Sequence, residues 1–187
     1  MRYLALGDSY TIGTGATDPS RSWPSIIARR LGAELTNPAV NGYTTENLIR
    51  HELPLVEKVN PDLVTVLIGV NDLVQGRTLD EYRWSLRTIY DALRGRLVVA
   101  VSIPTWAYVP AAADFGGADH VGRLTAAFNQ VAREEATSRD FFWVDIGPAS
   151  TLRIGSSGWV ASDSLHPGDS QYEAWAEAIW PVVRDLV

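Results

Sequence analysis

Residues 63–72 read LVTVLIGVND, an apolar run that ends in a short polar segment. The run Leu63–Ile68 is rich in Val, Leu and Ile and does not alternate with polar residues, which is typical of a strand buried on both faces. Similar runs of strand length occur elsewhere, at Arg2–Leu6, Leu97–Ser102 and Phe141–Asp145, with a weaker one at Glu34–Asn37. The sequence therefore predicts a sheet of about five strands.

Patterns typical of helices fill the gaps between these runs. Apolar residues recur at helical spacing around residues 23–31, 79–93, 121–132 and 170–183. A further helix is expected over Thr45–Lys58, with Pro54 bending or dividing it. Strands that alternate with helices form a parallel sheet covered on both faces. We expect one domain over residues 1–187, a three-layer α/β sandwich.

Composition and charge exclude several classes of protein. A chain of 187 residues with 46% hydrophobic and 20% charged residues is of ordinary globular type, not disordered. The net charge of −6 disfavours nucleic acid and anionic membrane surfaces as partners. The absence of Cys excludes disulfides, thiolate metal sites and a Cys nucleophile.

Hydropathy predicts neither a membrane span nor a signal peptide. The longest apolar run has far fewer than the about 20 residues that cross a bilayer. Near the N-terminus, the polar residues Gly7-Asp8-Ser9 follow the short run Tyr3–Leu6 at once. We expect a cytoplasmic protein, although a secreted protein whose leader has been removed would have the same sequence. Oligomeric state is not indicated.

Polar segments that contain glycine follow three of the predicted strands. They are Gly7–Ser9, Gly69–Asp72 and the loop from Ile146 to Asp169. Ligands of parallel sheets bind at the carboxyl ends of the strands, so these segments are where chemistry is expected.

Two of these segments contain a potential nucleophile and base. Ser9 stands at a strand-to-helix turn, where its hydroxyl either caps the next segment or, with a base to take its proton, acts as a nucleophile. Of the three His, His51 and His120 are expected at the surface. His166 follows Asp163 by three residues, and in a turn the carboxylate and imidazole can meet, which fixes the ring tautomer.

Two further residues can stabilise an oxyanion. Asn71 offers a side-chain amide, and Gly42 offers a backbone N–H that no side chain obstructs. Either residue alone is more often part of a turn. Together with Ser9, Asp163 and His166 they supply every role that acyl transfer requires.

The same residues resemble the four ordered sequence blocks of the SGNH hydrolases, also called GDSL-type esterases and lipases. The matching segments span most of the chain in the family's order: Gly7–Tyr10, Gly42, Gly69–Asp72 and Asp163–His166. The resemblance implies a flavodoxin-like α/β/α sandwich with a mainly parallel sheet. It also implies a small-molecule ester as substrate and neither a metal nor an organic cofactor.

Carried over by motif, the resemblance implies a role for each residue. Ser9 is the nucleophile, and its own N–H is one oxyanion donor. Gly42 and Asn71 supply the second and third donors, His166 is the general base and Asp163 its partner. Short-chain acyl or acetyl esters are the expected substrates; lysophospholipids and thioesters are alternatives within the family.

Three other interpretations compete with this one. The segment Thr11–Thr17 has the hydroxyl and glycine content of a flavodoxin phosphate loop, which would make the protein a flavin- or phosphate-binding module. A domain that keeps the fold without activity would serve only for interaction. A metal site at Asp8, Asp72, Asp163 and His166 is disfavoured, because it includes one His and no recognisable ligand spacing.

The segment from residue 104 to residue 117 is expected to determine specificity. It holds three aromatic residues in a long connection with little helical periodicity, and such connections are usually functional or disordered. We expect it to form a wall or a lid of the substrate pocket, with Trp106 or Tyr108 limiting acyl length or stacking on the leaving group. The alternative is that these rings only cover the core. Trp159 is also expected to face the site, and the other Trp residues to pack in the core.

Overall fold

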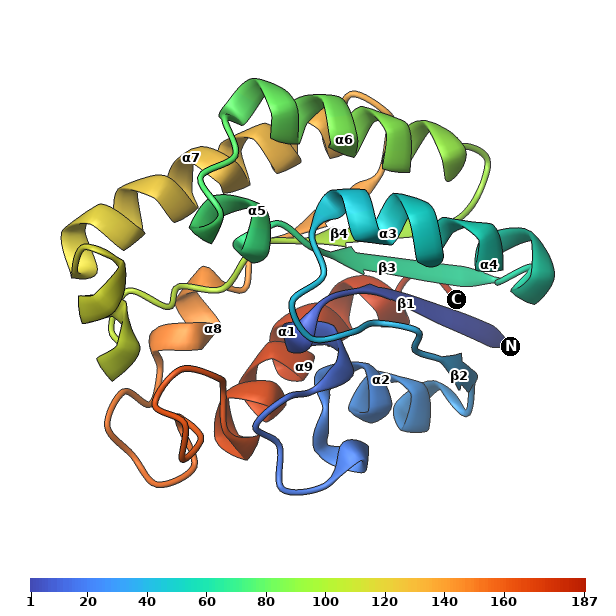
Figure 1. The fold of residues 1–187 in the computed structure, drawn as a ribbon. Helices are drawn as coiled ribbons and strands as arrows, with labels where there is room; N and C mark the ends of the chain where they lie inside the picture. Colours follow the sequence, from blue (N-terminus) through green and yellow to red (C-terminus); the bar gives the residue numbers. More distant parts are fainter.

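The computed structural model describes all residues, 1–187, and folds them around one five-stranded sheet (Figure 1). The strands are β1 (Arg2–Gly7), β2 (Glu34–Thr36), β3 (Leu63–Leu67), β4 (Val98–Val101) and β5 (Phe142–Val144). Every neighbouring pair is parallel, and the spatial order is β2-β1-β3-β4-β5. The expected α/β class and parallel sheet are therefore confirmed.

Helices cover both faces of the sheet (Figure 1). One face is covered by α3 (Thr45–His51), α4 (Leu53–Val59), α6 (Leu79–Ala92) and α7 (Ala118–Thr137). The other face is covered by α2 (Trp23–Leu31) and α9 (Asp169–Arg184). Short helices follow three strands directly: α1 (Ser9–Ile12), α5 (Val70–Val74) and α8 (Gly147–Thr151). Two 3₁₀ turns, Pro19–Arg21 and Pro110–Phe115, lie in longer connections.

The division between α3 and α4 follows from local chemistry. Thr44 caps α3 in a capping box with Asn47, and Pro54 occupies the first turn of α4, where a missing N–H costs no hydrogen bond. Glu52 lies between the two helices and is completely buried. The predicted helix is therefore divided near its proline, as expected.

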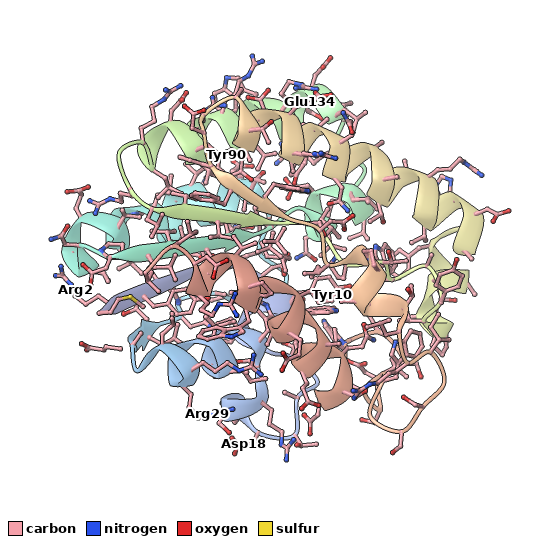
Figure 2. The ribbon with its side chains drawn as sticks, turned by 180° about the vertical axis from the view of Figure 1, so that it is seen from behind. Arg2, Tyr10, Asp18, Arg29, Tyr90 and Glu134 are labelled. Atoms are coloured by element: carbon pink, nitrogen blue, oxygen red, sulfur yellow. The ribbon has the colours of Figure 1, made fainter.

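The core lies between the sheet and both helical layers. Forty-seven buried hydrophobic residues form one cluster, and all of β3 is buried, as its unbroken apolar sequence predicts. Tyr10, labelled in Figure 2, belongs to this interior. The expectation that Trp84 packs in the core was wrong: it is 69% exposed, because the buried face of α6 carries Tyr82, Leu86 and Ile89 instead.

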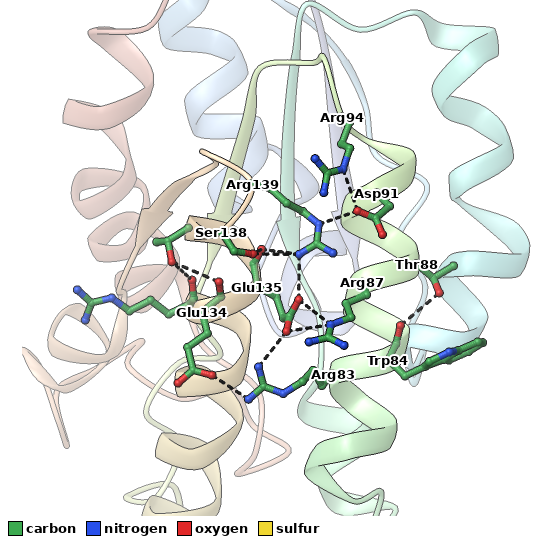
Figure 3. A network of polar contacts seen from close by, with 12 residues as sticks. Arg83, Trp84, Arg87, Thr88, Asp91, Arg94, Glu134, Glu135, Ser138 and Arg139 are labelled. Carbon is green, nitrogen blue, oxygen red and sulfur yellow. Dashed lines mark hydrogen bonds and ion pairs between the residues drawn. The ribbon is translucent and has the colours of Figure 1, made fainter.

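A network of arginines and glutamates joins α6 to α7 (Figure 3). Glu135 of α7 has only 6% of its side chain exposed and forms ion pairs with Arg83 and Arg87 of α6. It also pairs with Arg139, which lies in the turn after α7 and has 7% of its side chain exposed. Because three cations surround one buried carboxylate, the pKa of Glu135 is lowered even though burial acts against its charged form.

Replacing Glu135 by Ala is expected to destabilise the fold by about 1–3 kcal/mol, since it removes a buried hydrogen-bonded carboxylate and leaves Arg139 paired with Asp91 alone. Glu134→Ala serves as control, because Glu134 is 46% exposed and its pair with Arg83 is worth about 0–1 kcal/mol. Urea unfolding of both variants measures the difference. Equal losses in the two variants would show that the network contributes nothing beyond surface pairing.

Both chain ends lie at the same end of the sheet. The N-terminus precedes β1 and the C-terminus follows α9, and both lie at the amino ends of the strands, away from α1 and α5 (Figure 1). No helix combines the length and the apolar character needed to cross a membrane.

Candidate active site

The turn that presents Ser9 is held by close packing. A side chain at Gly7 would place its Cβ 2.3 Å from the Leu67 carbonyl oxygen, so only glycine fits at this contact between β1 and β3. Asp8 caps α1 by accepting the N–H of Tyr10 at 3.0 Å. Ser9 follows as the first residue of α1 and is 5% exposed. The serine therefore stands at the carboxyl end of a central strand.

Asp163 and His166 lie near the tip of a hairpin-like loop. An isolated antiparallel bridge between Val160 and Pro167 closes this loop. The His166 ring Nδ1 and Asp163 Oδ2 are 2.6 Å apart, and Asp163 Oδ1 accepts the backbone N–H of His166 at 2.9 Å. Ser164 between them adopts a left-handed conformation with φ +63°, which turns the chain tightly enough for the two side chains to meet.

The carboxyl of Asp163 is suited to remain ionised. Partial burial acts against its charged form, but the hydrogen bonds from the His166 ring and from the N–H groups of Leu165 and His166 outweigh this effect. They hold the pKa of Asp163 below its ordinary value. A carboxylate bound to Nδ1 fixes the ring so that Nε2 is available as a base.

His166 packs against the segment that contains Ser9. The ring of Tyr10, the residue after Ser9, meets the His166 ring edge to face with centroids 6.2 Å apart. Gly15 is also close to His166: a Cβ added at Gly15 would lie 3.1 Å from the Cβ of His166. The structure thus places the His166 ring against the residue that follows Ser9.

The segment Gly42–Thr45 is fixed to the end of β3. The side-chain amide of Asn71 donates to the Tyr43 carbonyl at 2.8 Å, which leaves its second N–H free for another acceptor. Asp72 accepts the N–H of Thr45 at 2.9 Å and its hydroxyl at 2.5 Å. Gly42 is exposed, has φ +80° and donates its N–H to no protein acceptor. Both candidate oxyanion donors therefore have an uncommitted N–H.

Sequence reasoning missed two buried carboxyl groups at this edge. No motif in the sequence assigns a role to Glu52, whose Oε2 accepts the N–H of Gly7 at 2.9 Å. Asp72 was considered only as a metal ligand, whereas it clamps Thr45. Burial raises the pKa of Asp72, although the two bonds from Thr45 and the charge of Arg77 act in the opposite direction. No sequence pattern distinguishes Glu52 from an exposed helical glutamate.

The two tryptophans that are expected to face the site are largely buried. Trp106 and Trp159 are 3% and 4% exposed and belong to the hydrophobic core. The indole N–H of Trp159 donates to the Ser150 carbonyl at 2.9 Å. Trp159 therefore anchors the base of the loop Val160–Pro167, the histidine loop, which holds Asp163 and His166. Tryptophans in loops are buried here because their loops are closely packed.

Tyr108 remains available to a ligand. It is 57% exposed and lines a groove of about 500 Å³ between its own segment, α7 and α8. None of Ser9, Gly42 and His166 lines this groove. The same connection does contact the loop that holds Asp163 and His166, because the N–H of Ala111 donates to the Ser164 carbonyl at 3.1 Å.

The competing interpretations find little support in this geometry. The hydroxyls of the suspected phosphate loop are engaged by the protein: Thr14 donates to Asn41, and Thr17 donates to the carboxylate of Asp169, which would repel phosphate. Asp72 and Asp163, suggested as metal ligands, face separate partners. No three or more His, Asp and Glu side chains are grouped so as to hold a metal ion.

Comparison with known proteins shows the family of the chain. Residues 5–174 match the family described as GDSL-like Lipase/Acylhydrolase. The curated Esterase TesA of Pseudomonas aeruginosa is 22% identical over 98% of this chain and 88% of its own length. An Arylesterase of Vibrio mimicus is 34% identical over 40% of each chain.

Solved structures share the fold. A crystal structure of TesA superposes with a TM-score of 0.80 at 22% identity, covering 100% of both chains. A carbohydrate acetylesterase family member from Sinorhizobium meliloti gives 0.77 at 20% identity, over 100% of this chain and 99% of the other. With its family blocks at one edge of this sheet, the chain belongs to the GDSL-like lipase/acylhydrolase family and is a carboxylic ester hydrolase.

Proposed function

We propose that the protein hydrolyses small carboxylic esters through an acyl-serine intermediate formed on Ser9. The observation that carries this proposal is the 2.6 Å pair of Asp163 and His166, with the imidazole packed against Tyr10 beside the serine. An oriented base next to a serine at a strand end is the arrangement that converts a weakly nucleophilic hydroxyl into an attacking group.

In the acylation step, Nε2 of His166 accepts the proton of the Ser9 hydroxyl as Oγ bonds to the ester carbonyl carbon. The tetrahedral intermediate collapses when the bond to the alcohol oxygen breaks and His166 returns the proton to that oxygen. Water then repeats the sequence on the acyl-enzyme, releasing the acid and restoring the serine. Asp163 stabilises the imidazolium in both steps without taking its proton.

The oxyanion is held by three N–H donors in this proposal. They come from the backbone of Ser9 and Gly42 and from the side chain of Asn71. The uncommitted N–H groups at Gly42 and Asn71 support the assignment. Because the Asn71 amide and the Asp72 carboxylate fix the Gly42 segment before substrate binds, the donors are preorganised, which is what makes such a site effective.

Asn71→Ala is expected to lower kcat by about 10²- to 10³-fold, the usual cost of one preorganised donor. KM should change much less, because the donor engages mainly the transition state. Steady-state kinetics on an activated acetyl ester measure both constants. Asn41→Ala is the control, since Asn41 precedes the same glycine but its side chain bonds only to the half-buried Thr14. A loss of stability with normal kcat in Asn71→Ala would remove its catalytic role.

Short-chain acyl or acetyl esters are the proposed substrates. Gly42 and Asp163 are exposed, so the site opens directly to solvent, which suits small soluble esters. The connection that holds Tyr108 contacts the histidine loop through Ala111 and is proposed to form one wall of the pocket. Lysophospholipids and thioesters are the alternatives that a substrate screen must include.

The experiment that tests the proposal is stoichiometric labelling by an organophosphonate, with the adduct mapped by mass spectrometry. We expect one label per chain, on Ser9. It is combined with rates for acetyl, butyryl and hexanoyl esters, a lysophospholipid and a thioester, of which the acetyl and butyryl esters should be preferred. A label on another residue would overturn the nucleophile assignment.

A further inference from the structure

Two carboxyl groups lie beneath the Ser9 turn, and the proposed reaction uses neither. Asp8 and Glu52 are completely buried, and each has one oxygen held by a backbone N–H of this turn. Glu52 Oε2 accepts from Gly7 and Asp8 Oδ1 from Tyr10. The remaining oxygens, Glu52 Oε1 and Asp8 Oδ2, have no hydrogen-bond partner. The two side chains therefore hold the residues on both sides of the nucleophile.

The surroundings of this pair disfavour two negative charges. The nearby carboxyl of Asp72 raises the pKa of Asp8, and Asp8 in turn raises the pKa of Glu52. Asp8 also raises the pKa of three phenols on α1, α6 and α9, those of Tyr10, Tyr82 and Tyr172. Asp163 also raises the pKa of Tyr10 and Tyr172, whereas the positive charge of Arg77 acts to lower the pKa of Asp72. A charge on Glu52 would thus be opposed by its neighbours.

Burial is the main reason that both groups resist ionisation. It raises the pKa of Glu52 to about 8, and the charge of Asp8 adds to the effect, while the Gly7 hydrogen bond acts against it. Burial also raises the pKa of Asp8 to about 7, with Asp72 contributing. Because Asp8 Oδ1 caps α1, a role that suits a charged carboxylate, Glu52 is the neutral member of the pair.

We propose that Glu52 is a positioning residue that acts as a neutral carboxylic acid, accepting the Gly7 N–H beneath the nucleophile while Asp8 serves as the helix cap. This inference rests on the proposed role of Ser9. When Glu52 loses its proton, a second negative charge lies under a site where negative charge develops on the substrate oxygen. The ionised form therefore repels Asp8, displaces the turn and opposes the transition state.

The test is Glu52→Gln, which keeps the shape and the acceptor for Gly7 but cannot ionise. Glu57→Gln is the matched control, because Glu57 lies on α4 with 85% of its side chain exposed. One pH unit above the pKa of Glu52, only about one tenth of the wild-type molecules keep the proton, so kcat should fall by up to about ten-fold in wild type and in Glu57→Gln. Glu52→Gln should hold its plateau. The same alkaline fall in Glu52→Gln would overturn the inference.

Thermal unfolding provides a readout that does not depend on activity. The native state keeps the Glu52 proton up to about pH 8, whereas the unfolded chain loses it near the ordinary value of 4.5. Stability must therefore fall as pH rises between these values. The Tm of Glu52→Gln should decline less steeply than that of wild type and should exceed it above pH 8. An unchanged slope contradicts the neutral acid.

Infrared spectroscopy of the wild-type protein tests the same point without any substitution. A protonated carboxyl band should persist near pH 7 and weaken in Glu52→Gln, where the contribution of Asp8 remains; its absence from wild type would overturn the inference. These readouts separate the two proposals. If Ser9→Ala stays active while Glu52→Gln flattens the Tm profile, the nucleophile assignment fails and the buried acid stands.

Discussion

Ser9→Ala is expected to lower kcat for ester hydrolysis by roughly 10⁴- to 10⁶-fold, the largest effect of any single substitution in this chain. The hydroxyl is the only group in the proposed mechanism that forms a covalent bond to the substrate. Residual activity should come from the oxyanion donors and from binding, which still act on attacking water. The rate is measured with an activated acetyl ester at high enzyme concentration, so that slow turnover can be detected above spontaneous hydrolysis.

The fold should not suffer from this change. Ser9 contributes its backbone carbonyl to the bonds that end α1 at Gly13 and Thr14, and alanine retains that carbonyl. Ser156→Ala is the control, since Ser156 is an exposed loop serine whose hydroxyl bonds only to Arg153. Wild-type rates in Ser9→Ala would show that the ester is cleaved by another group.

His166→Ala is expected to be nearly as damaging, while Asp163→Asn should leave measurable activity. The imidazole moves the proton in every step, whereas the carboxylate orients the ring and stabilises its charged form. Steady-state kinetics on an activated acetyl ester for the three proteins test these expectations together.

The stability of the histidine loop should follow the ionisation of Asp163. Its pKa is lowered in the folded state, so its hydrogen bonds contribute stability above its ordinary value. That contribution is lost as pH falls through the lowered value.

His120→Ala is the control for the loss of a histidine in His166→Ala, because His120 is exposed near the start of α7. Equal activity in His166→Ala and His120→Ala would leave the enzyme without a base in the proposed site.

The fold could be predicted from the sequence because strand and helix patterns are local. The unbroken apolar run of β3 and the proline that separates α3 from α4 are visible in the residues themselves. The residues proposed for catalysis follow strands, and a parallel sheet collects such residues at one edge. Neither conclusion needs knowledge of long-range packing.

The remaining features depend on packing that single residues do not reveal. Trp159 is in a polar loop, and only the contact with Ser150 shows that the loop folds over its ring. Glu52 has the sequence context of a solvated side chain, yet the break between two helices turns it inward to Gly7. Trp84 is the opposite case, an apolar side chain that is exposed because it lies on the side of α6 that faces solvent.

The positions of the chain ends have a practical consequence. Both ends lie at the amino ends of the strands, whereas Ser9 follows the carboxyl end of β1 (Figure 1). An affinity tag, a fused carrier or a solid support joined at either terminus is therefore attached at the opposite end of the strands from the proposed site. Enzyme coupled to a resin through either end should turn over small esters at the rate of free enzyme, and the two orientations should perform alike.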